Sequence, residues 1–221
     1  MNPTFETSGI ANSSTATGTI GLTLGSNSNR VLISFSNCNE KDSITPSLGG
    51  ISFTPISSSI GDNLTQRSQV FMYFSPPTGS QTVTYTRTII SGGGNPYSFT
   101  CFSYYNVNQT FPDSSVIYAT PGTSIENGHT ISTTPVVANS LFWGAGTYDS
   151  IATPLTSGLT HNQTSNSGVT GGGIIAGDNG LVSTTTSWSQ GGTSQFYNQV
   201  AITLAPSQPI VGGAFLYQML N

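Results

Sequence analysis

The chain has 221 residues, of which 35 % are hydrophobic and only 5 % are charged, and its formal net charge is −4. Ordinary globular proteins carry about 25 % charged residues, so this chain relies on Ser, Thr, Asn and Gln for solubility. Its hydrophobic share is too high for a disordered chain. The only cations are Arg30, Lys41, Arg67 and Arg87, and they are too few and too scattered for a nucleic-acid track or a polybasic membrane contact.

The N-terminal stretch MNPTFETSGI has neither a basic region nor an apolar region, so no Sec-type signal peptide is predicted. No apolar run approaches the ~20 residues that cross a bilayer. The composition is nevertheless of an extracellular kind, poor in Lys and rich in Thr, Ser and Gly. Together these features predict a component of a virion surface, released by lysis; the alternative is an extracellular or cell-surface location.

The first half of the chain contains alternating runs that predict β-strands. Residues 15–24 place Ile20, Leu22 and Leu24 on one face, and residues 30–36 follow after a Gly-Ser-Asn turn. Residues 44–56, ITPSLGGISFTPI, predict a hairpin with Gly49-Gly50 at a two-residue turn. Residues 70–86, VFMYFSPPTGSQTVTYT, predict a second hairpin, because a Pro-Gly turn separates two alternating runs.

The second half continues the same pattern. Residues 97–105, YSFTCFSYY, are the most continuously apolar run and predict a central strand covered on both faces. Further extended runs follow at residues 130–134, 140–148, 181–190 and 197–206, with a short buried strand around Ile174 and Ile175. No window shows helical periodicity over three turns. The sequence predicts an all-β fold: one antiparallel β-sandwich of jelly-roll type over residues 1–206, without an internal repeat, followed by a tail over residues 207–221.

No enzyme is predicted. His129 and His161 are expected to be loop or strand-end residues without a chemical role, and no G-x-S-x-G elbow is present. A glycosidase pair would have to come from eight acids that lie mostly in expected turns. These acids are Glu6, Glu40, Asp42, Asp62, Asp113, Glu126, Asp149 and Asp178.

No cofactor or metal site is predicted either. NEKD at residues 39–42 and GDNG at residues 177–180 offer oxygen ligands for calcium, but without the spacing of a dedicated loop. An Asx-turn explains Asp178 equally well. Cys38 and Cys101 are the only cysteines; two buried free thiols are expected, with a disulfide left open, and zinc lacks ligands.

Aromatic residues leave one binding hypothesis open. Trp143 and Trp188 lie in expected strands, and exposed indoles would form a platform for sugar rings. Packing of both indoles in the core is the simpler interpretation.

The order of several motifs resembles a family of jelly-roll-type β-sandwiches seen in phage virion proteins and in bacterial surface or secreted proteins. NRVLISFS, LGGISFTPI, VFMYFSPPTGSQTVTYT, YNVNQTFP, a GGG segment, TSWS and VAITLAP carry the resemblance, which covers about residues 15–206. The predicted hairpin with its PPTG turn is the most specific element. The resemblance implies a binding or structural module with no catalytic residues to transfer.

The sequence therefore predicts a non-enzymatic structural protein of a virion surface, either a capsid decoration or cement protein or a subunit of a spike or tail attachment. Its expected partners are other virion proteins and copies of itself, with neither nucleic acid nor membrane. The alternative is a carbohydrate-binding or adhesive module that recognises a surface glycan.

The last residues, SQPIVGGAFLYQMLN, are too apolar for a free chain end. The sequence predicts that this tail docks on a neighbouring subunit or on another virion protein, with folding back on its own sandwich as the alternative. The predicted assembly residues are Ile210, Val211, Phe215, Leu216, Tyr217, Met219 and Leu220.

Overall fold

The structure, a computed structural model, describes residues 1–39, 42–62, 66–89, 96–110, 112–119, 129–148, 159–166, 173–190 and 198–207. Within these ranges the regular structure is entirely β, and every pair of neighbouring strands is antiparallel. The predicted all-β, antiparallel sandwich is confirmed. Its jelly-roll type stays a prediction.

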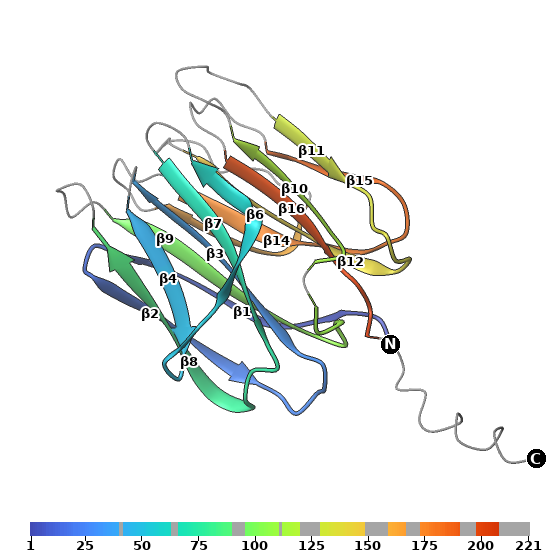
Figure 1. Ribbon diagram of the computed structural model, residues 1–221, viewed down its shortest axis with the longest axis horizontal. Coiled ribbons are helices and arrows are strands. Elements are labelled where there is room, and N and C mark those ends of the chain that lie inside the picture. Colours follow the sequence, from blue (N-terminus) through green and yellow to red (C-terminus); the bar gives the residue numbers. More distant parts are fainter. Residues whose placement is uncertain are drawn as a thin grey trace, which may run out of the picture.

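Strands β1 to β9 form a first unit of two sheets (Figure 1). The first inner sheet has the order β1-β9-β3-β7-β6 and consists of β1 (Thr4–Ser13), β9 (Tyr97–Tyr105), β3 (Val31–Asn39), β7 (Gln66–Phe74) and β6 (Thr54–Asp62). The first outer sheet has the order β2-β8-β4-β5 and consists of β2 (Thr17–Leu24), β8 (Gly79–Thr88), β4 (Ser43–Leu48) and β5 (Ile51–Ser52).

Strands β10 to β16 form a second unit, also of two sheets. The second inner sheet has the order β10-β16-β12-β14-β13 and consists of β10 (Ser114–Ala119), β16 (Asn198–Leu204), β12 (Ser140–Tyr148), β14 (Gly173–Val182) and β13 (Thr160–Asn166). The second outer sheet pairs β11 (His129–Thr133) with β15 (Thr186–Gln190). The main ladders stay within one unit, and a single bridge, Val107 to Pro206, ties the connection to the second unit.

The two units repeat one topology. If β1, β2, β3, β6, β7, β8 and β9 are matched in order with β10 to β16, the inner sheets have identical strand orders and the β2–β8 pair matches β11–β15. Among the described strands, only β4 and β5 lack a counterpart. Asn29 and Asn139, both with a positive φ, lie just before the matched strands β3 and β12, where the left-handed conformation suits Asn. The prediction of a chain without an internal repeat is therefore wrong at the level of strand order.

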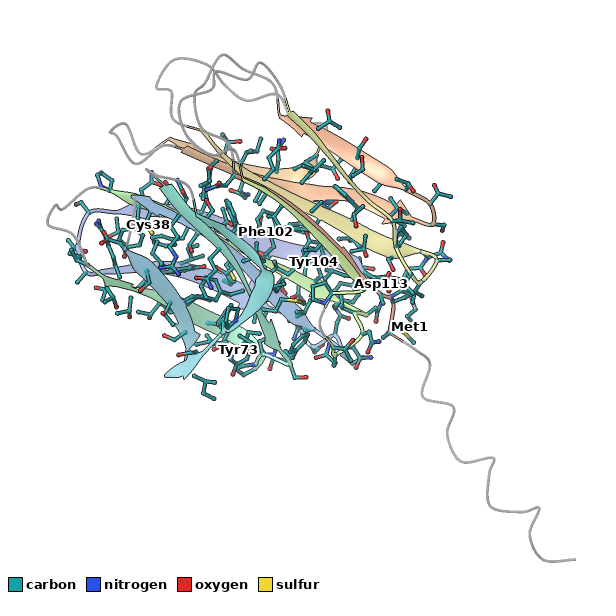
Figure 2. The ribbon with its side chains drawn as sticks, turned by 45° about the horizontal axis from the view of Figure 1, so that its top comes forward. Met1, Cys38, Tyr73, Phe102, Tyr104 and Asp113 are labelled. Atoms are coloured by element: carbon teal, nitrogen blue, oxygen red, sulfur yellow. The ribbon has the colours of Figure 1, made fainter. Side chains whose placement is uncertain are left out.

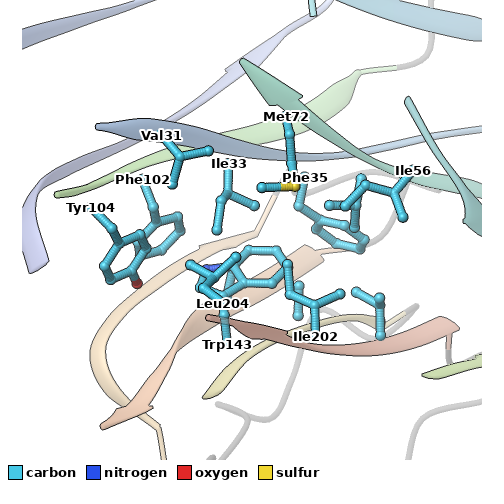
Figure 3. Close-up of a cluster of buried hydrophobic side chains, with 14 of the residues drawn as sticks. Val31, Ile33, Phe35, Ile56, Met72, Phe102, Tyr104, Trp143, Ile202 and Leu204 are labelled. Atoms are coloured by element: carbon cyan, nitrogen blue, oxygen red, sulfur yellow. The ribbon is translucent and has the colours of Figure 1, made fainter. Parts of the chain in front are cut away.

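The units pack with their inner sheets face to face. The largest hydrophobic cluster joins Ile33 and Phe102 of the first unit to Trp143 and Ile202 of the second, and Figure 3 shows these side chains pointing toward one another. Strand contacts across the interface occur in matched pairs. The contact of β1 with β13 corresponds to that of β10 with β6, and the contact of β9 with β13 corresponds to that of β16 with β6. Exchanging each strand for its counterpart in the other unit converts one contact of each pair into the other. The interface therefore has an approximate two-fold symmetry like that of a homodimer.

A second cluster, containing Phe99 and Tyr85, fills the first unit between its inner and outer sheets. A third, containing Phe142 and Ile131, lies between the two sheets of the second unit. Both faces of the first inner sheet are therefore covered. This confirms the prediction for residues 97–105, of which eight are buried in β9.

The 70–86 hairpin is a wrong prediction. Both strands form, but β7 pairs with β3 and β6, whereas β8 pairs with β2 and β4 in the other sheet. Pro76 and Pro77 lack the N–H groups that would begin a ladder at the turn, and Ser75 has φ 51°, so the chain crosses from the inner to the outer sheet. The Gly49-Gly50 hairpin is confirmed: β4 pairs with β5, and both glycines have positive φ.

Candidate functional site

A buried carboxylate lies at the boundary between the two units. Asp178 of β14 is 1 % exposed, and its Oδ2 accepts a hydrogen bond from the Tyr104 hydroxyl of β9 at 3.0 Å. The same oxygen lies 2.9 Å from Nδ1 of His161 in β13. Oδ1 accepts from the Thr160 hydroxyl at 2.8 Å and from the Gly180 amide at 3.4 Å. Figure 2 shows Tyr104 and Phe102 between the strands of the two units.

The local sequence explains why these groups meet. Ile174, Ala176 and Asp178 alternate along β14 and face the first unit, so the strand continues its apolar face with a carboxylate. The β13–β14 register shifts between Thr160 and Gln163, and such a bulge re-aims a side chain. His161, inside the bulge, has φ 46°. A non-glycine residue in this region is strained and is held by its surroundings.

Gly177 makes this bulge sterically feasible. A Cβ atom at residue 177 would lie 2.7 Å from the Thr160 carbonyl oxygen. Real Cβ atoms do not approach backbone oxygen so closely, so the bulged strand would be displaced by any side chain there. In the GDNG motif, Gly177 thus allows the backbone of the bulged strand to come close, and the next residue, Asp178, supplies the buried carboxylate.

The carboxylate determines the protonation pattern around it. An ionised Asp178 only accepts, so Nδ1 of His161 carries a hydrogen and Nε2 is left to accept when the imidazole is neutral. Burial raises the pKa of Tyr104 well above its usual value, and the negative charge of Asp178 raises it further. Tyr104 therefore stays protonated and donates its hydrogen bond to Asp178 over the physiological pH range.

The imidazole itself lies at the surface. The His161 side chain is 49 % exposed, and its ring stacks on Phe5 of β1 with centroids 4.0 Å apart and planes 9° apart. Phe5 also meets the Tyr104 ring edge-on at 5.8 Å. In the described part of the chain, no nucleophile is bonded to Nε2. The arrangement is a clamp between β1 and β9 of one unit and β13 and β14 of the other.

The other described carboxylates are also used inside the fold. Glu6 accepts two hydrogen bonds from Arg30, at 2.7 and 2.9 Å, and one each from Ser103 and the Gly25 amide. Burial opposes ionisation of Glu6, but its bonds from Arg30, Ser103 and Gly25 outweigh this and lower its pKa. Asp42 forms a buried ion pair with Arg87.

Asp113 has a different structural role. Its Oδ2 accepts from the amides of Val136 and Val137, at 2.7 and 3.0 Å, and from the Ser140 hydroxyl at 3.2 Å. One carboxylate thus holds the segment that leads into β12. Four of the eight acids, Glu6, Asp42, Asp113 and Asp178, therefore accept hydrogen bonds within the fold.

The glycan platform that the sequence leaves open as an alternative loses one of its two residues. Trp143 is 0 % exposed and lies in the cluster between the units. Trp188 and His129 lie in β15 and β11, and their side chains are outside the part that the structure describes. The seven predicted assembly residues of the tail, Ile210, Val211, Phe215, Leu216, Tyr217, Met219 and Leu220, are outside it as well.

Cys38 and Cys101 are both buried and form no disulfide with each other, which answers the open question of their pairing. Among the described residues, no three His, Cys, Asp or Glu side chains gather closely enough to hold a metal ion. No helix within the described ranges has the length and apolar character to cross a membrane.

Comparisons with protein-family models, with curated proteins and with solved structures found no match for this chain. Its function is therefore argued from its own residues.

Proposed function

We propose that this chain is a non-enzymatic structural protein of a virion surface, as a capsid decoration or cement protein or as a subunit of a spike or tail attachment. The observation that carries the proposal is where its charged groups lie. Glu6, Asp42 and Asp178 are bound inside the fold, as are Arg30 and Arg87. What remains on the described outer strands is mainly hydroxyl-bearing. Such a surface offers few groups for acid–base chemistry, which favours a structural role.

The sequence supports the same proposal. Its motif order resembles a β-sandwich family of phage virion and bacterial surface proteins, and its composition, poor in Lys and rich in Thr, Ser and Gly, is of an extracellular kind. The His161–Asp178 pair is compatible with a structural role, because Asp178 also binds Tyr104 and Thr160 and thereby joins the units.

The test is the composition of purified particles. We expect the protein at a fixed ratio to the major capsid protein in virions from the native host, banded on a density gradient and quantified by mass spectrometry. Because its surface charges are few, attachment should survive 1 M NaCl, which screens contacts between exposed charges. Particles from a deletion strain are the control. Absence of the protein from gradient-purified virions would overturn the proposal.

The apolar tail is the proposed assembly element. Each large apolar side chain of the tail would gain about 1.5–3 kcal/mol on burial, and a neighbouring subunit would supply such a surface. Five of them lie close together: Phe215, Leu216, Tyr217, Met219 and Leu220. Truncation after Ser207 is expected to leave a folded, soluble monomer that no longer assembles, measured by sedimentation velocity. Unfolding of the truncated chain, or assembly with natural stoichiometry, would contradict this role.

A further inference from the structure

The outer face of the first outer sheet is formed almost only by hydroxyl groups. In β2, β4 and β8 the inward positions are occupied by core residues such as Ile20, Ile44 and Val83. Every outward position in these three strands is Ser or Thr, with Gly21 the one exception. A Cβ atom at Gly21 would meet nothing within 4 Å, so the face is open there. We call it the hydroxyl face.

The register arranges these hydroxyls in rows. Thr17 lies opposite Thr86, which lies opposite Thr45 on the other side, and the next row is Thr19, Thr84 and Ser47. Neighbouring strands are about 4.8 Å apart, and same-face residues along a strand are about 6.8 Å apart. The six residues therefore form a regular two-dimensional array at the centre of the sheet.

Residue type makes this array well suited to binding. Thr is stiff at χ1, so its hydroxyl and methyl groups lose little conformational freedom when a ligand orders them, in contrast to Lys, Arg or Gln. A hydroxyl both donates and accepts, so it matches another hydroxyl in either orientation. Four of these six residues, Thr17, Thr19, Thr45 and Thr86, are classed as exposed, and Thr84 and Ser47 as half-buried.

The chemistry of the face selects among ligands. It has no charge, so a charged polymer would leave its own charges without partners. It also has no aromatic, Met or Arg side chain, the residues in which protein interfaces are enriched. The complement of a neutral, regularly spaced hydroxyl array is a neutral polymer that presents hydroxyls at regular intervals, which is a polysaccharide.

We propose that the hydroxyl face binds a neutral polysaccharide through many individually weak hydrogen bonds. This goes beyond the proposed structural role and does not depend on Trp143 or Trp188. Affinity would come from several contacts along one polymer chain, as expected for a particle protein that holds a glycan-coated surface reversibly.

The test is retention of the full-length protein on microcrystalline cellulose and on granular starch, with alginate beads as the anionic comparison. We expect retention on at least one neutral polymer, unchanged between 0.05 and 1 M NaCl. Thr19→Val with Thr84→Val removes two central hydroxyls and keeps the β-branched shape. This double variant should lower the apparent affinity about tenfold.

The control is Thr4→Val with Thr164→Val, which changes two exposed threonines of β1 and β13 outside the face. It should bind as the natural chain does, and both variants should show unchanged melting temperatures. No retention on either neutral polymer, retention only on alginate, or equal binding by the Thr19/Thr84 variant would overturn the inference. A dimer that is lost in that variant would instead assign the face to a second copy. None of these outcomes affects the particle experiment.

Discussion

The hydroxyl of Tyr104, in the last strand of the first unit, donates a 3.0 Å hydrogen bond to the carboxylate of Asp178 in the second unit. Both groups are buried, and the carboxylate also receives bonds from Thr160 and His161. A buried charge is tolerated when it is well hydrogen-bonded. This relationship makes the contact between the units specific as well as apolar, because only one alignment of β9 and β14 satisfies the carboxylate.

Replacing Asp178 with Asn should destabilise the protein by about 2–3 kcal/mol, because an amide loses the charge-assisted bonds from Tyr104 and His161. Tyr104→Phe removes one donor and should cost about 1–2 kcal/mol. The measurement is the free energy of unfolding in urea at pH 7. Thr164→Val, on the same strand as His161 but without a bond to Asp178 among those described, is the control. A neutral effect of Asp178→Asn would show that the clamp does not stabilise the fold.

The stability of the protein should fall in acid partly through Glu6. Its pKa is lowered in the folded chain because bonds from Arg30, Ser103 and Gly25 outweigh the effect of burial. Because the pKa of Glu6 is lower in the folded than in the unfolded chain, its ionised form stabilises the fold. This contribution is complete above the pKa of the unfolded chain, about 4.3, and is lost as the pH falls through the pKa of the folded chain. Glu6→Gln should therefore be less stable than the natural chain at pH 7, and the difference should shrink toward pH 3. A pH-independent difference in unfolding free energy would contradict the assignment.

The thiols should resist modification in the folded protein. Burial raises the pKa of Cys101 to about 12, although a bond from Tyr85 acts in the opposite direction, and Cys38 is buried too. We expect iodoacetamide at pH 8 to label neither cysteine natively and both in 6 M guanidinium, counted by intact mass. The Cys101 thiolate forms more readily in the unfolded chain. The free energy of unfolding should therefore fall as the pH rises from about 9 toward 12. Native labelling of Cys101 would contradict its burial.

The core between the units has an unsatisfied donor. Nε1 of Trp143 is buried without a hydrogen-bond partner, which costs about 1–3 kcal/mol. Trp143→Phe removes this donor as well as some volume, so its stability should stay within about 1 kcal/mol of the natural chain. Trp143→Ala leaves a cavity and should cost about 3–5 kcal/mol. Thermal and urea unfolding of the two variants check this, and similar losses for both would show that the indole nitrogen is satisfied in solution.

The sequence predicts the strands better than their partners. Alternation correctly places Ile20, Val83 and Val200 inward, because burial of one strand face is a local pattern. Alternation does not say which sheet a strand joins. The sequence therefore predicts a hairpin around Ser75, where the chain instead passes from the inner to the outer sheet. Pairing depends on contacts between residues far apart in the chain, which alternation does not encode.

The repeat and the clamp were missed for related reasons. The units share strand order but few residues, since a sandwich tolerates many apolar combinations. His161 and Asp178 are 17 residues apart, and a bulge with a positive φ brings them together. One local signal was available: Asp178 falls on the inward side of the Ile174–Ala176 alternation, which marks a buried carboxylate that needs partners.

The last prediction concerns the two-fold relationship between the units. Their inner sheets bury Phe102, Trp143 and Ile202 against one another, and the main ladders do not cross from unit to unit. A protease site inserted after Thr110, an exposed residue of the connection, should therefore be cleaved without separating the halves. We expect native mass spectrometry of the cleaved full-length protein to show both fragments in one complex, as in a homodimer held by an apolar interface.

The same insertion in the Trp143→Ala chain should weaken the complex, which distinguishes core packing from the tail as the cause of association. Fragments that separate while each stays folded would show that the connection, and not the interface, holds the units together.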